Sequence, residues 1–379
     1  MTLTAVVLIL MAVSVWYVPF RLKKLLELRR VWPWHVLSIG VVAGYILLIF
    51  KGIYTWDSLP AAVAYDTLGL LFVFLVYLFF FLIVTHPLTL LVKRIPGRPL
   101  GYGGIAVSAS LVILGFSNAQ TFVVTHDELP VKRLARPVRI VHVPDIHLGA
   151  QRGQSWLGKM LAAVDEQQAD VVLYNGDLVD SNIALKPELF SLFKTVRAEQ
   201  YFTTGNHEYY LDTDRALRLI GDAGIRILRS EMVETHGIQL IGMEYMNADR
   251  ETWDAHAVND LTLQEELPRI ARDGEKPALL VHHSPVGMRY AAQGNIDVML
   301  AGHTHGGQFF PGNVLVKYRF PMYGGRYKIG DMTLLVSRGA GTFGPWMRLG
   351  TRNEVQVIDL IPAATETQSS DPNVNVLPP

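Results

Sequence analysis

Residues 138–149 read VRIVHVPDIHLG, and this stretch decides how the larger part of the chain is interpreted. Its first six residues form an apolar, β-branched run, which is typical of a buried strand. Pro144 follows the run, and Asp145 and His147 come directly after it. In open α/β sheets, ligands bind at the carboxyl ends of the strands. The stretch therefore predicts a strand that ends in a functional site.

The same succession of strand and polar group recurs along the chain. Strands are predicted at 170–174, 201–204, 225–229, 238–243, 278–282, 296–301, 325–329, 332–337 and 354–360. Helices are predicted at 154–168, 187–198, 213–223, 261–272 and 286–292. Four of the strands are followed by NGDLVD (175–180), GNHE (205–208), HHSP (282–285) and GHTHGG (302–307). The alternation predicts an α/β domain in which these groups converge on one edge of the sheet.

The residue types in these groups are those of a metal site. Carboxylate, imidazole and amide oxygen ligands suit Mn, Fe, Zn or Co. Glycines precede Asp177, Asn206 and His303, and they allow the backbone to turn tightly beside an ion. A single Asp-x-His or Gly-Asp is uninformative, whereas five such groups in this order are specific. The ligands are too many for one tetrahedral ion, and two ions about 3.5–4 Å apart would use them all.

These groups resemble the calcineurin-like metallophosphoesterase superfamily, whose pattern is D-x-H, G-D, G-N-H-[DE], H-x-P and G-H-x-H. The resemblance extends from about Val138 to Leu360 and implies a four-layer αββα sandwich with a dinuclear metal centre. The segment from SRGAG (337–341) to Glu354 is similar to the branch that includes membrane-attached bacterial phosphoesterases. Pro144 stands where the family often has Ser, a difference that we expect to be harmless.

The resemblance also implies a role for individual residues. It implies that one divalent ion is bound by Asp145, His147 and His305, that a second is bound by Asn206, His283 and His303, and that Asp177 bridges the two. His207 would be catalytic without binding metal, with Glu208 or another acid orienting it. Strand alternation sends His282 and His283 to opposite faces, and the H-x-P pattern selects His283. The implied reaction is in-line attack on a phosphoester by a hydroxide that bridges the two ions.

The amino-terminal third has a different character. Apolar runs cover roughly residues 3–20, 33–50, 63–92 and 102–124, and a spanning helix needs about 20 apolar residues. Four such runs favour membrane helices over buried soluble helices. We therefore predict a transmembrane region of about four helices at 1–124, a polar linker at 125–137, the phosphoesterase domain at 138–362 and a disordered tail at 363–379. This arrangement is similar to transmembrane proteins with a metallophosphoesterase domain.

The distribution of charge predicts the orientation in the membrane. The 34 basic and 34 acidic residues balance, which disfavours nucleic-acid binding, and the absence of cysteine excludes disulfides and thiolate metal sites. Five basic residues lie in the loop 21–31 and three in the loop 93–101. The positive-inside rule places both loops in the cytoplasm and the catalytic domain outside the cytoplasmic membrane. Four basic residues between 132 and 139 weaken this bias.

Three functions are consistent with these patterns. The leading prediction is a multi-pass, membrane-anchored phosphodiesterase whose partners are the lipid bilayer and a phosphoester, possibly lipid-linked. The second is a cytoplasm-facing pyrophosphatase of a nucleotide-linked lipid precursor, which a topology reporter fused at residue 379 would distinguish. The third is a non-enzymatic membrane binding or transport protein, which the scarcity of charged residues in the spans disfavours. Phe343 and Trp346 could face a lipid acyl chain or simply pack.

Overall fold

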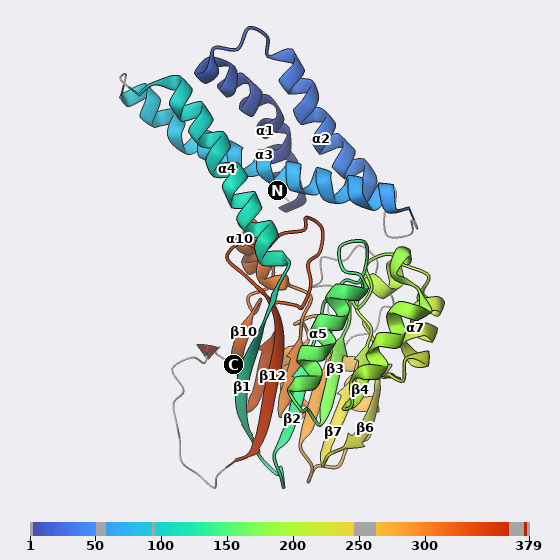
Figure 1. The fold of residues 1–379 in the computed structure, drawn as a ribbon. Coiled ribbons are helices and arrows are strands. Elements are labelled where there is room, and N and C mark those ends of the chain that lie inside the picture. The colour runs from blue at the N-terminus through green and yellow to red at the C-terminus, as the bar shows by residue number, and fades with distance from the viewer. Residues whose placement is uncertain (1–2, 51–57, 93–94, 246–262, 364–374, 377–379) are drawn as a thin grey trace. The chain divides into compact units, whose positions relative to one another are not determined.

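The computed structural model describes residues 3–50, 58–92, 95–245, 263–363 and 375–376. The chain divides into two compact units (Figure 1). The helical unit comprises Met1–Gln120 together with Gly344–Leu349, and the sheet unit comprises Thr121–Phe343 and Gly350–Pro379. Each unit has its own core, so each is described by itself.

The helical unit is built from four helices: α1 (Leu3–Leu26), α2 (Trp32–Phe50), α3 (Leu59–Leu91) and α4 (Gly97–Ala119). Among the described residues, Trp32–Ile49, Leu59–Leu91 and Gly97–Ala119 are long and apolar enough to cross a membrane. The helix α1 is not one of these three, so the fourth span stays a prediction. The loop Gly344–Leu349 packs within this unit, where the Trp346 ring lies edge-on to Phe116, at a centroid distance of 5.2 Å.

The first sheet of the other unit has the order β1-β12-β2-β3-β4-β5. Its strands are β1 (Phe122–Val131), β12 (Asn353–Pro362), β2 (Val138–His142), β3 (Val171–Asn175), β4 (Glu199–Thr203) and β5 (Arg226–Ile227). Strands β2 to β5 are parallel, and β12 runs antiparallel to β2. Strands β2, β3 and β12 are buried along most of their length, as expected for β-branched runs that are covered on both faces.

The second sheet has the order β13-β10-β11-β9-β8-β7-β6. Its strands are β13 (Asn375–Val376), β10 (Gly325–Ile329), β11 (Met332–Val336), β9 (Val298–Ala301), β8 (Ala278–Val281), β7 (Ile238–Gly242) and β6 (Glu231–Thr235). Strands β7, β8, β9 and β11 are parallel to one another. The carboxyl ends of β8 and β9 therefore lie on the same edge.

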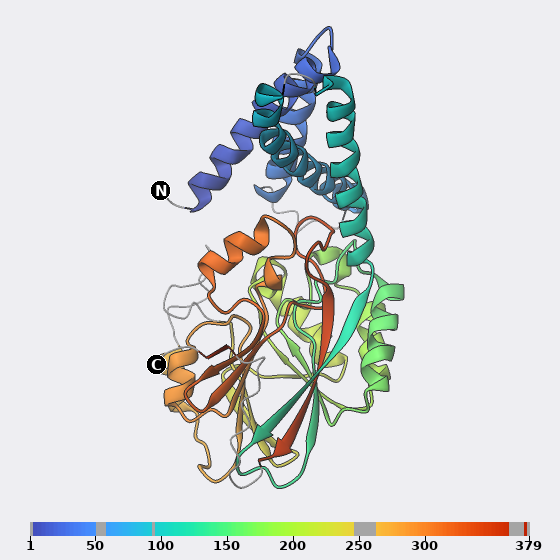
Figure 2. The ribbon, with the colours of Figure 1, turned by 90° about the vertical axis from the view of Figure 1, so that its left-hand side faces the viewer.

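Helices accompany both sheets. They are α5 (Gln154–Glu166), α6 (Pro187–Phe190), α7 (Thr213–Asp222), α8 (Leu263–Glu266), α9 (Met288–Gln293) and α10 (Gly312–Arg319), with short 3-10 turns at 182–184, 191–195, 207–210, 267–269 and 305–307. In Figure 2, α5 (green) and α9 (orange) lie on opposite outer sides of the strands. The predicted α/β class is confirmed.

Three buried apolar clusters hold these layers together. One joins the first sheet to α5, α6 and α7, and it includes Leu157, Phe190 and Ile220. A second contains residues of both sheets, such as Ile140 and Leu300. A third joins the second sheet to α8 and α9. Each sheet therefore packs against helices, and one apolar cluster contains residues of both sheets.

The domain differs from the prediction at its amino-terminal end. The predicted linker 125–137 is wrong over its first half, because β1 runs from Phe122 to Val131 and pairs with β12 along its whole length, which satisfies its backbone hydrogen bonds. The predicted fourth membrane segment, 102–124, is too long at its end, because α4 ends at Ala119 and β1 begins at Phe122. The predicted disordered tail lies mostly outside the described residues, apart from its first residue, Ala363, and Asn375–Val376 in β13.

Candidate metal centre

All of the predicted site residues follow the carboxyl ends of parallel strands. Asp145 and His147 follow β2, Asp177 follows β3, and Asn206 and His207 follow β4. His283 follows β8, and His303 and His305 follow β9. Because the strands of each sheet are parallel here, these loops meet at one edge. All of these residues are buried except His303, whose burial is intermediate.

The first group consists of Asp145, His147 and His305, whose ligand atoms all lie within 4.8 Å of one another. Nε2 of His147 lies 3.0 Å from Nε2 of His305, and the latter atom lies 3.6 Å from Oδ1 of Asp145. Two imidazole nitrogens that share a metal ion at about 2.1 Å are about 3 Å apart when they subtend a right angle. The spacing therefore suits two nitrogen ligands of one ion.

The second group consists of Asp177, His283 and His303, again within 4.8 Å. Nδ1 of His283 lies 2.7 Å from the carbonyl oxygen of Asn175, so this bond directs Nε2 into the site, 3.2 Å from Oδ2 of Asp177. The same Oδ2 atom lies 3.8 Å from Nε2 of His147. Asp177 thus lies between the two groups.

Asn206 completes the second group from the loop after β4. Its Nδ2 donates to the hydroxyl of Tyr210, at 3.0 Å, which leaves Oδ1 as the free atom of the amide. Oδ1 is buried and has no hydrogen-bond partner among the described residues. A buried acceptor without a partner is costly, and a cation would remove that cost. The donor set and this oxygen both fit a divalent metal ion.

The two adjacent histidines differ in their surroundings. His283 belongs to the second group, whereas Nδ1 of His282 lies 2.8 Å from the carbonyl oxygen of Ser284. Burial lowers the pKa of His282 to about 4. The structure therefore brings His283, and not His282, among the candidate ligands.

An acid that the sequence interpretation did not single out lies beside His207. Oδ1 of Asp180 lies 2.9 Å from Nδ1 of His207 and 3.2 Å from Nδ1 of His147. Asp180 comes three residues after Asp177 and ends the NGDLVD stretch, so its position in that motif was the available signal. The acid beside His207 is therefore Asp180 and not Glu208, and it is the other acid that the sequence prediction left open.

Glu208 has a different task. Its carboxylate accepts hydrogen bonds from the backbone amides of Asp177 at 3.0 Å, Leu178 at 2.8 Å and Gly205 at 2.7 Å. These amides belong to the loops after β3 and β4. The Glu208 side chain is fully buried, so water cannot replace these hydrogen bonds. The carboxylate therefore links the two loops.

The backbone of the site is held in an uncommon conformation. Asp145, His147, Asp177, His303 and His305 all have φ between 52° and 69°. Such values are uncommon for residues other than glycine and occur where the surroundings impose them, often at functional sites. Close packing explains why residue 205 is a glycine, since a Cβ atom at this position would overlap the Asp177 carboxylate.

The carboxylates of the site favour the protonated form of two of its histidine rings. Burial alone lowers the pKa of an imidazole, and it lowers that of His303 to about 3. At His207 and His283 burial is the largest single effect and acts in the same direction, but the nearby carboxylates and hydrogen bonds together outweigh it and raise the pKa values to about 9 and about 10. The site therefore favours cations, and metal binding at His283 has to displace a proton.

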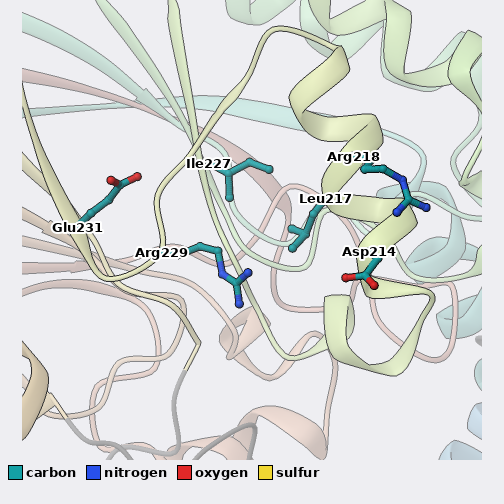
Figure 3. Close-up of a pocket in the computed structure, with 6 residues that line it drawn as sticks. All are labelled: Asp214, Leu217, Arg218, Ile227, Arg229 and Glu231. Carbon is teal, nitrogen blue, oxygen red and sulfur yellow. The ribbon is translucent and has the colours of Figure 1, made fainter.

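Phe343 borders the site. Its ring centroid lies 5.1 Å from that of His207 and 6.0 Å from that of His147. A separate pocket of about 540 Å³ lies elsewhere (Figure 3), and it is lined by Asp214, Leu217, Arg218, Ile227, Arg229 and Glu231. None of these residues belongs to the metal centre, and Arg229 is paired with Glu244.

Comparison with known proteins agrees with this geometry. The family profile described as calcineurin-like phosphoesterase matches residues 138–307. A Danio rerio protein, "Transmembrane protein with metallophosphoesterase domain", is 29% identical over 368 residues, which are 88% of this chain and 81% of that protein. A Campylobacter jejuni protein, "Uncharacterized metallophosphoesterase Cj0846", is 30% identical over 264 residues, which are 68% of each chain. "Phosphodiesterase YaeI" of Escherichia coli is 27% identical over 241 residues, 60% of this chain and 83% of that protein.

Proposed function

Because this chain belongs to the calcineurin-like metallophosphoesterase family, we propose that it is a membrane-anchored enzyme that hydrolyses phosphodiesters with two divalent metal ions. The observation that carries the proposal is the position of Asp177 between the two histidine groups, with the unpaired oxygen of Asn206 beside them. The proposal includes the four-layer αββα arrangement and four membrane spans. The ions would be Mn, Fe, Zn or Co.

The ligands are divided between the two ions as follows. Asp145, His147 and His305 would hold one ion, Asn206, His283 and His303 the other, and Asp177 would contact both. When bound, the ions would supply charge neutralisation for the phosphoryl oxygens and a water with a lowered pKa for in-line attack. Asn206 contributes a neutral ligand, which limits the negative charge that an anionic substrate meets.

His207 is the proposed catalytic residue of the chain itself. Its ring faces the site, where Nε2 lies 3.9 Å from Oδ2 of Asp177, and Asp180 holds its other nitrogen. Asp177 and Asp180 favour the protonated ring. A protonated His207 would stabilise the phosphoryl oxygens or give its proton to the leaving oxygen.

We expect His207→Ala to lower turnover by about 10²–10⁴, the usual contribution of a general acid or base. Bound metal, measured by elemental analysis, should be unchanged because His207 is not a ligand in this assignment. Loss of metal from the variant would show instead that His207 is a ligand.

The predicted membrane helices suggest that the substrate is found at a membrane. A relative of this chain is named a transmembrane protein, and three described helices could cross a membrane. We propose a phospholipid or a lipid-linked phosphodiester as substrate, reached by a catalytic domain outside the cytoplasmic membrane. The relative named phosphodiesterase YaeI supports the diester over the pyrophosphatase alternative.

The test compares two soluble esters with the full chain in detergent and added Mn. We expect hydrolysis of bis-p-nitrophenyl phosphate to exceed that of p-nitrophenyl phosphate, and a chelator to abolish it. Hydrolysis of the monoester alone would make the enzyme a phosphomonoesterase. No turnover of either ester, with metal bound, would favour the binding or transport alternative.

A further inference from the structure

Exposed apolar side chains are concentrated in one part of the sheet unit. Among its described residues, the large hydrophobic side chains that are exposed are Phe310, Val314, Tyr318 and Phe343, with exposed fractions of 43%, 57%, 83% and 42%. Scattered single residues of this kind need no explanation, but a cluster indicates an interaction site. We call these four residues the apolar edge.

The helix α10 supplies two members of the apolar edge. Val314 and Tyr318 lie four residues apart and so share one face of the helix. The opposite side packs inward, since Val316 contacts the buried cluster of Val286 and Phe320. The helix thus has an inner face that anchors it and an outer apolar face that no described residue covers.

The charge of this region complements an anionic surface. Residues 298–319 contain no Asp or Glu, whereas they contain Lys317 and Arg319. Lys317 lies on α10 directly before Tyr318 and is exposed. Basic residues beside exposed apolar ones are typical of segments that lie on membranes with anionic lipids.

The apolar edge adjoins the metal centre. Nε2 of Gln308 donates to the carbonyl oxygen of Phe343 at 2.8 Å, and the amide of Phe343 donates to Oε1 of Gln308 at 2.9 Å. Gln308 comes three residues after His305 and two before Phe310, and Phe343 borders His207. An acyl chain held on this edge would therefore have its phosphoester next to the candidate ligands.

From these observations we propose that the apolar edge is a docking surface for the lipid bilayer, which inserts Phe310, Val314 and Tyr318 among the lipids. The occupant is a bilayer because the chain already carries helices that could cross one, which keeps the bilayer at a high effective concentration. The role in substrate delivery rests on the proposed function, whereas the docking itself does not.

The natural absence of cysteine allows a direct test on the full chain. Tyr318→Cys, labelled with an environment-sensitive fluorophore, is reconstituted in nanodiscs that contain about 30 mol % phosphatidylglycerol. Glu275→Cys is the control, because Glu275 is exposed and lies in the loop before β8, at the opposite end of the strands. Replacing the lipids by brominated lipids should quench the label at position 318 at least about twofold more than at position 275, because a docked helix is buried about 5–10 Å into the interface.

Val314→Cys provides a second site, one turn away, in case the first variant does not fold. The proposal would be overturned if the label at position 318, or at position 314, were quenched no more than the label at position 275. So would protection of the label from aqueous iodide without quenching by brominated lipid, since that result indicates contact with protein, such as a second copy of the chain.

A second measurement separates docking from catalysis. The double variant Val314→Asn, Tyr318→Asn should lower hydrolysis of a phospholipid in vesicles relative to hydrolysis of bis-p-nitrophenyl phosphate by about fivefold or more. An unchanged ratio would overturn the delivery role. If the wild type hydrolyses no diester, the proposed function fails, and the quenching result still decides whether the edge docks on the bilayer.

Discussion

Asp177→Asn is expected to reduce the hydrolysis of bis-p-nitrophenyl phosphate at least about a hundredfold. Loss of a residue that only supports metal ligands typically costs 10–100-fold, and Asp177 lies between both candidate groups. Asparagine is tolerated in the left-handed backbone conformation that this position requires, and its oxygen can still accept the hydrogen bond from the His207 amide. The fold should therefore persist while the negative ligand is lost.

Metal content and turnover are measured together on the Asp177→Asn protein. The matched control is Asp165→Asn, which removes a surface ion pair with Arg197 and should leave turnover unchanged. Wild-type turnover in the Asp177→Asn protein would contradict the dinuclear assignment. Reduced turnover in both variants would point to a general effect on folding.

Glu208→Ala is expected to destabilise the sheet unit strongly. The substitution removes the acceptor of four buried backbone amides, which belong to Asp177, Leu178, Val179 and Gly205. Each unsatisfied buried donor costs about 1–3 kcal/mol, so the variant should lose several kcal/mol of unfolding free energy. The loops that carry Asp177 and Asn206 should separate, with loss of bound metal.

Thermal unfolding and metal content in detergent check this expectation. Glu208→Gln is the informative companion, because it keeps the size of the side chain but offers one carbonyl oxygen in place of two acceptors. We expect it to fall between the wild type and Glu208→Ala. An Ala variant as stable as the wild type would show that water can satisfy these amides.

The candidate ligands could be predicted from the sequence because each of them is marked by the residues next to it. Each candidate ligand sits directly after a β-branched run, and a parallel sheet brings such positions together whatever the rest of the fold does. The relation between His207 and its acid was not predictable in this way. Glu208 is adjacent in sequence but points from a 3-10 turn to the backbone, whereas Asp180 reaches His207 from the loop of another strand.

The elements that the sequence interpretation missed or misread have weak local signals. The strand β1 contains Pro130, which disfavours a strand except at the edge of a sheet, and its first residues continue an apolar run. A short apolar run does not distinguish the end of a helix from a strand. The helix α10 was missed because it is only eight residues long and contains the β-branched Val314 and Val316, which lower helix propensity.

The pairing of β1 with β12 has a consequence for biogenesis. β1 is the first strand of the domain, yet its partner is made only when residues 353–362 have been synthesised, and β12 also separates β1 from β2. Ribosomes add about 5–20 residues per second, so β1 waits for more than ten seconds without a partner. The sheet cannot close cotranslationally before the last part of the chain emerges. A nascent chain that is truncated before residue 353 would thus present two open strand edges to the quality-control machinery of the cell.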